Sequence, residues 1–121
     1  MTDGRPRGGL VLRTSRDRMT AGPTADQVRA EVEYLPRDGW LVLECDSDAF
    51  AQVWLRPDGV YQVEHGFGAL PEPGGVRHAA LRSALTVSRD KVSAALGRWA
   101  HADPDWAAAF TWSSVPLPVG G

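Results

Sequence analysis

Cysteine is almost absent from this chain, since Cys45 is the only one among its 121 residues. A single thiol excludes an internal disulfide framework, and a reducing cytoplasm is then the expected location. Long hydrophobic runs are absent as well, because none approaches the roughly 20 residues that cross a bilayer. Residues 1–18 also lack the apolar stretch of about 7–15 residues that a signal peptide needs. We therefore expect a cytoplasmic protein with no membrane contact.

Motifs for catalysis and cofactor binding are absent too. The stretch GFGALPEPGG at 66–75 lacks the spacing of a phosphate-binding loop, no dinucleotide fingerprint follows a strand, and no GxSxG elbow occurs. The three histidines are too widely spread for a metal-ligand motif; they are His65, His78 and His101. On these grounds we predict no cofactor, no metal ion and no enzymatic activity.

Charge is unevenly distributed along the chain. Residues 1–23 carry a net charge of +3 and residues 24–121 a net charge of −5, which gives −2 for the whole sequence. An acidic body argues against nucleic acid as the ligand, because phosphate neutralisation needs clustered Lys and Arg. Residues 1–23, rich in Gly, Pro and Arg, are interpreted as a disordered or weakly ordered tail with at most a short edge strand at 10–13. The alternative that this basic tail attracts an anionic partner stays open.

Local patterns divide residues 24–121 into the elements of one domain. Thr24 and Gln27 form a capping box in front of a helix that Pro36 ends. Ser88 caps a second helix with apolar residues at helical spacing. The other expected elements are a long loop at 65–78, a strand at 81–87 (with a helix as the alternative), a short helix at 104–110 and a final strand at 111–115.

The segment 40–64 predicts a three-stranded antiparallel meander. A Pro-Asp-Gly loop at 57–59 suits a hairpin with a bulge and sets the register of one strand pair. An Asp-Ser-Asp loop at 46–48 sets the register of the other and places Trp40 opposite Trp54. One face of the meander is then apolar and faces the core. It consists of Leu41, Leu43, Cys45, Ala51, Val53, Leu55, Tyr61 and Val63.

The opposite face of the meander mixes aromatic and polar side chains. Aromatic anchors within a polar rim are typical of protein-binding surfaces. We therefore predict a partner-binding site with Trp40 and Trp54 as anchors and with Glu44 and Glu64 supplying charge complementarity. The predicted site residues are Trp40, Glu44, Gln52, Trp54, Gln62 and Glu64. The alternative is that the C-terminal strand, the loop at 65–78 or the N-terminal tail covers this face.

Aromatic residues are concentrated near the C-terminus, in DPDWAAAFTW at 103–112. Asp103 and the proline after it favour a helix start, and a helix at 104–110 would place Trp106 and Phe110 on one face. We expect these two side chains to join Trp99 in the core, whereas Trp112 can lie on either side of its strand.

The order of these elements, with DGWLVLE at 38–44, LRPDGVYQVEHG at 55–66 and a W-x-x-x-F-x-W ending, resembles small uncharacterised proteins of actinobacteria. More loosely, it is similar to immunity proteins of polymorphic-toxin systems, which are compact acidic α+β proteins of the cytoplasm. The resemblance covers residues 24–115 and assigns no functional residue. It implies a binding function, in which an acidic face occludes the active site of a basic partner, often a nuclease.

The predicted fold is therefore a single α+β domain, an antiparallel sheet made of the meander and one or two further strands, with helices packed on one face. The predicted function is non-enzymatic binding of a protein partner. Two other classes stay open, a secretion-chaperone-like or regulatory dimer that holds a peptide, and a small enzyme with a closed pocket. The sequence leaves both monomer and homodimer open.

Overall fold

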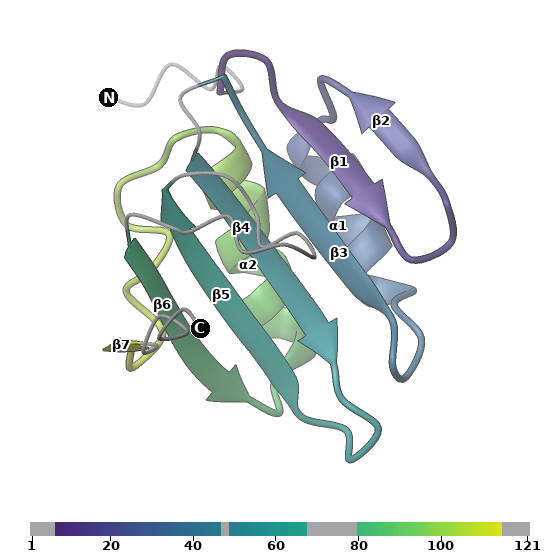
Figure 1. Cartoon of the computed structure of the whole chain (residues 1–121), viewed down its shortest axis with the longest axis vertical. Helices are drawn as coiled ribbons and strands as arrows, with labels where there is room; N and C mark the ends of the chain where they lie inside the picture. Colours follow the sequence, from purple (N-terminus) through teal and green to yellow (C-terminus); the bar gives the residue numbers. More distant parts are fainter. Residues whose placement is uncertain (1–6, 47–48, 68–79, 115–121) are drawn as a thin grey trace, which may run out of the picture.

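The computed structural model describes residues 7–46, 49–67 and 80–114. Over these residues the chain forms one antiparallel sheet of seven strands in the order β2-β1-β3-β4-β5-β6-β7. The strands are β1 (Val11–Thr14), β2 (Met19–Ala21), β3 (Trp40–Glu44), β4 (Ala49–Leu55), β5 (Tyr61–Phe67), β6 (Ala80–Thr86) and β7 (Ser113–Ser114). Both helices, α1 (Ala25–Glu33) and α2 (Arg89–Ala100), lie on the same face of this sheet (Figure 1). The predicted single-domain α+β architecture is confirmed, with a wider sheet than expected.

The meander has the register that its loops predict. Trp40 on β3 faces Trp54 on β4, and Trp54 faces Gln62 on β5. Gly59 adopts a left-handed φ of +87°, the conformation that a hairpin loop with a bulge requires at this position. Because side chains alternate between the two faces of a strand, this register decides which residues face the helices and which face outward.

Side chains cap both helices as predicted. The Thr24 hydroxyl accepts a hydrogen bond from the Gln27 amide at 3.1 Å, and the Gln27 side chain accepts one from the Thr24 amide at 2.8 Å. The Ser88 hydroxyl accepts a bond from the Lys91 amide at 3.2 Å at the start of α2. These bonds satisfy amides that the first helical turn leaves without a partner.

The core lies between the sheet and the two helices. Its most deeply buried residues include Leu41, Leu43, Val53 and Val63 from the sheet and Val28, Val32, Val92 and Leu96 from the helices. Full burial of each stabilises the fold by about 1.5–3 kcal/mol. Trp99 is buried here as predicted. Gly97 of α2 faces α1, where an added Cβ would lie 3.0 Å from Arg29 Nε, so the missing side chain allows the two helices to approach closely.

The N-terminal segment differs from its prediction, which was wrong for the residues described here. Residues 11–14 form β1 within the sheet, between β2 and β3, and are neither disordered nor at the edge. Leu10 and Leu12 are buried in the core, and their burial stabilises a segment that has few other apolar residues. The Arg7 guanidinium lies 4.2 Å from the centre of the Trp99 ring and donates a hydrogen bond to the Trp99 carbonyl. The folded domain therefore begins before residue 24.

The short helix predicted at 104–110 is not formed, and these residues make a succession of turns. Its predicted start is present, because the Asp103 carboxylate accepts a hydrogen bond from the Asp105 amide at 2.9 Å. Beyond that point amides bond to carbonyls three residues back, as the Phe110 amide does to Ala107 at 3.2 Å. Seven residues are too few for an α-helix to be stable by local propensity alone.

Two further boundaries differ from expectation. β5 continues to Phe67, so the long loop predicted at 65–78 starts later than the sequence indicates. The final strand is limited to Ser113–Ser114 where the structure describes it. The rest of the predicted loop, including His78, lies outside the described residues, as do residues 47–48 of the first meander loop and residue 115.

Candidate functional site

The six predicted site residues lie on the outer face of the sheet, the face opposite α1 and α2. They are Trp40, Glu44, Gln52, Trp54, Gln62 and Glu64. Strand pairing sets Trp40 beside Trp54, and Gln52 beside Glu64. The two indoles are accessible, with 42 % of Trp40 and 37 % of Trp54 exposed. The register predicted from the two loops thus brings the expected aromatic and polar groups together.

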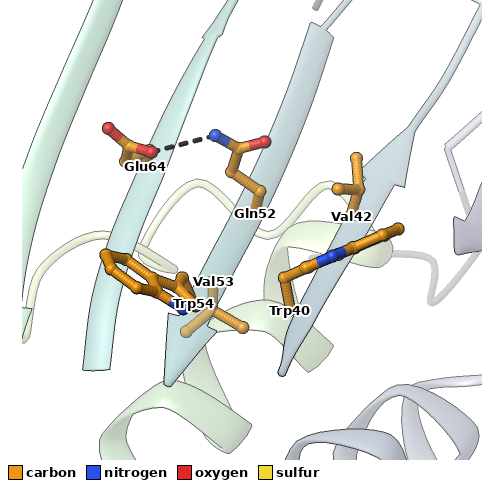
Figure 2. Close-up of a pocket in the computed structure, with 6 residues that line it drawn as sticks. All are labelled: Trp40, Val42, Gln52, Val53, Trp54 and Glu64. Atoms are coloured by element: carbon orange, nitrogen blue, oxygen red, sulfur yellow. Dashed lines mark hydrogen bonds between the residues drawn. The ribbon is translucent and has the colours of Figure 1, made fainter. Parts of the chain in front are cut away.

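A shallow hollow of about 300 Å³ lies among these side chains. It is lined by Trp40, Val42, Gln52, Val53, Trp54 and Glu64. Figure 2 shows the two indoles at one end of the hollow, leaning away from each other, and the side chains of Gln52 and Glu64 at the other end. One end is therefore aromatic, and the other combines Gln52 and Glu64 with Val42, which pairs with Gln52 (Figure 2).

The polar end of the hollow is organised by a cross-strand hydrogen bond. Gln52 Nε2 donates to Glu64 Oε1 at 2.9 Å (Figure 2). Both side chains are half-buried. This bond holds the carboxylate in place while leaving its negative charge uncompensated, because the amide is neutral. Glu64 forms no ion pair with any residue in the ranges that the structure describes.

The aromatic end is fixed by the turn that follows α1. Trp54 Nε1 donates to Asp38 Oδ1 at 3.0 Å, and Asp38 itself adopts a left-handed φ of +65°. The Asp38 amide in turn donates to the Leu55 carbonyl at 2.6 Å. Asp38 therefore links the turn to β4 and restricts the rotation of the Trp54 indole.

Glu44 and Gln62 lie beside the hollow and do not line it. Glu44 forms an ion pair with Arg13 on β1, with 3.7 Å between Arg13 Nε and Glu44 Oε1. Its charge is thus partly compensated within the chain, so Glu64 is the stronger candidate for attracting a cation. Gln62 continues the row of Trp40 and Trp54 onto β5.

Sequence reasoning missed several residues of the outer face. Arg13 and Met19 line a second hollow of about 330 Å³ that shares Trp40 with the first. Leu85, opposite Gln62 on β6, extends the aromatic row toward the other edge. Leu10 and Leu12 lie at strand spacing, which places Arg13 on the opposite face, but the assignment of this segment to a tail concealed this signal.

Phe50 is an exception on the outer face. It alternates with the buried Ala49 and Ala51 of β4 and is paired with Glu44, yet only 2 % of it is exposed. The outer face is therefore accessible around Trp40 and Trp54 and buried at Phe50.

The C-terminal aromatics form a separate cluster around His65. The centre of its ring lies 4.7 Å from that of Trp106 and 4.6 Å from that of Trp112, both in edge-on arrangements. Burial, and secondarily the charge of Arg82, lower the pKa of His65 below its usual 6.5. Phe110 also packs on Trp112. Trp106, Phe110 and Trp112 are only partly buried and extend the core at its margin.

Within the described ranges no group of three or more His, Cys, Asp and Glu side chains is arranged to hold a metal ion. Cys45 is half-buried against the core, and its Sγ donates to the Ala49 carbonyl at 3.5 Å. Neither α1 nor α2, the helices in the described part of the chain, is long and apolar enough to cross a bilayer. No family model, curated protein or solved structure matches this sequence.

Proposed function

We propose that this protein is a non-enzymatic binding module that holds a folded, basic protein partner against its outer face. The observation that carries the proposal is the exposure of Trp40 and Trp54 beside a hollow on the side of the sheet that the helices leave uncovered. Tryptophan is among the side chains that most often dominate binding free energy at protein interfaces.

The arrangement around the indoles supports a partner surface. An interface needs apolar anchors surrounded by polar groups that exclude water and define orientation. Trp40 and Trp54 supply the anchors, and Gln52, Gln62 and Glu64 supply the polar surroundings. The hydrogen bond from Trp54 to Asp38 restricts the indole before binding, which lowers the entropy lost on association.

The charge of the protein supports a basic partner. Residues 24–121 carry a net charge of −5, and Glu64 presents an uncompensated carboxylate at the hollow. An inhibitor of the immunity type, which occludes the active site of a basic protein in the cytoplasm, has these properties. Electrostatic attraction of this kind accelerates association and is weakened by salt.

The test is capture of a partner by the purified protein from a cell lysate, followed by measurement of affinity for the captured protein. Trp54→Ala removes one anchor and should weaken binding by about 2 kcal/mol or more, roughly 30-fold in dissociation constant. Tyr34→Ala is the matched control, because Tyr34 is an exposed aromatic residue at the C-terminal cap of α1, 71 % exposed. It should bind like the wild type.

Melting temperatures decide whether Trp54 acts through binding or through folding. We expect Trp54→Ala to melt close to the wild type, since the indole is exposed and its hydrogen bond to Asp38 is at the surface. A large loss of stability would place Trp54 in the core and remove it from the site. Equal capture of the partner by the wild type and both variants would contradict the proposal. So would a homodimer, identified by light scattering, that binds unfolded peptides and no folded protein.

A further inference from the structure

We infer that the hollow between Trp40 and Trp54 receives one arginine side chain of the partner, with its guanidinium at Glu64. This inference rests on the proposed protein-binding function and names the chemistry by which the partner is recognised. Four observations carry it: the lack of an ion pair at Glu64 among the described residues, the size of the hollow, its division into aromatic and polar ends, and the distance of the β1 cation on the same face.

Glu64 differs from Glu44, the other carboxylate on the described strands. Glu44 pairs with Arg13 at 3.7 Å, and Asp58 with Arg56 at 2.9 Å. Glu64 is half-buried, and its partner in the described part of the chain is the neutral amide of Gln52. A partly desolvated carboxylate gains more from a cation than one in bulk water, because the local dielectric constant is lower. The partner can supply the cation that no described residue of this chain provides.

The size and shape of the hollow suit a single long side chain. A volume of about 300 Å³ lies at the lower limit of ordinary ligand pockets and is too small for a helix or strand. Trp54 and Gln52 are two residues apart on β4, which separates the aromatic and polar ends by about 7 Å. An extended arginine bridges that distance and places its apolar stem against the indoles.

Arginine fits the two ends better than a compact ammonium group does. Its planar guanidinium can donate several hydrogen bonds at once to carboxylate and amide oxygens, whereas an ammonium group is a compact point charge. The carboxylate of Glu64 and the carbonyl of the Gln52 side chain are such acceptors. The polar end of the hollow thus offers two neighbouring acceptors for the planar fork of arginine.

The cation on β1 does not prevent this binding. Arg13 shares the outer face with Glu64 but is separated from it by β3 and β4, so three strand spacings of about 4.8 Å lie between them. That distance exceeds the screening length of about 8 Å at physiological ionic strength. Arg13 also pairs with Glu44, which reduces its repulsion of a second cation.

The test uses two small probes that need no partner, N-acetylarginine methylamide and its uncharged isostere N-acetylcitrulline methylamide. Each is titrated into ¹⁵N-labelled protein, and the indole signals of Trp40 and Trp54, assigned from Phe substitutions, report binding. We expect the arginine probe to shift these signals with a millimolar dissociation constant and the citrulline probe to bind at least tenfold more weakly.

Two carboxamide variants make the test specific. Glu64→Gln removes the charge while retaining an acceptor for Gln52, and should abolish the preference for arginine over citrulline. Glu44→Gln removes the other carboxylate of the outer face, one that Arg13 already compensates, and should keep that preference. Preserved dispersion of the backbone signals establishes that both variants fold.

The outcomes separate the arginine site from the proposed function. Equal binding of the two probes, an unchanged preference in Glu64→Gln, or no shift at about 100 mM arginine probe overturns the arginine site. None of these results affects capture of a protein partner through Trp54. Arginine binding that depends on Glu64, without capture of any partner, contradicts the protein-binding function and retains the chemistry of the hollow.

Discussion

The position of β1 inside the sheet predicts a large loss of stability when Leu12 is replaced by alanine. Leu12 faces Leu43 on β3 and is only 2 % exposed. Removal of a buried leucine side chain costs about 2–5 kcal/mol, from the lost transfer free energy and the cavity left behind. The free energy of unfolding of a domain is about 5–15 kcal/mol, so Leu12→Ala should remove a large share of it.

Leu85→Ala is the matched control, because it makes the same chemical change in the same sheet. Leu85 lies on the outer face opposite Gln62 and is 58 % exposed. Its truncation leaves no cavity, and exposed substitutions of this kind usually change stability by less than about 0.5 kcal/mol. The two variants should therefore differ by at least about 1.5 kcal/mol.

Urea unfolding followed by tryptophan fluorescence measures both variants, and an unchanged dependence on urea concentration supports comparison of the midpoints. If Leu12→Ala unfolds within about 0.5 kcal/mol of the wild type, residues 11–14 are not packed on β3. Arg13 would then not lie on the outer face, and Glu44 would have no ion pair with it. Glu44 would no longer differ from Glu64 in charge compensation.

Two further predictions concern the N-terminal segment and pH. Gly22→Ala should cost about 1–2 kcal/mol in urea unfolding, the strain of a left-handed residue without steric conflict. Gly9→Ala should cost a similar amount, because Gly9 is also left-handed and the Asp46 carboxylate that its Cβ would meet is exposed and can rotate away. If these residues were a disordered tail, both glycine variants would be neutral. Burial lowers the pKa of His65, so the folded state disfavours its charged form, and the stability it contributes is present above about pH 6.5 and decreases as pH falls. Between about pH 7.5 and pH 5.5 the wild type should therefore lose more unfolding free energy than His65→Gln; equal losses would contradict this.

The meander was predictable because its information is local. The loop containing Gly59 and the alternation of apolar residues act within about 25 residues of chain, and together they decide register and face. The capped helix starts at Thr24 and Ser88 follow from equally local signals. Since Trp40, Gln52, Trp54 and Glu64 all belong to the meander, their meeting at one hollow follows from the same register.

The role of the N-terminal segment was not predictable from local patterns. β1 is stabilised by pairing with β3, which is separated from it by β2 and α1. Its composition, rich in Gly and Arg, favours disorder when considered alone. Likewise, the turns at 104–110 begin with a correct helix signal at Asp103, but Trp106 and Phe110 instead reach the cluster around His65. Contacts distant in sequence decide both cases.

This long-range pairing also changes how charge directs recognition. The sequence suggests a basic N-terminal tail and a separate acidic body. In the structure, arginines of residues 1–23 instead contact carboxylates of residues 24–121, as in the pairs Arg13–Glu44 and Arg18–Glu31. Each exposed pair adds little stability, yet together they reduce the acidic character of the surface. In the described part of the chain, two carboxylates beside the exposed aromatics have no ion pair, Asp38 and Glu64, and of these Glu64 is half-buried at the hollow. Recognition of a basic partner by the proposed surface should therefore depend on one cation placed at Glu64 more than on the net charge of either protein.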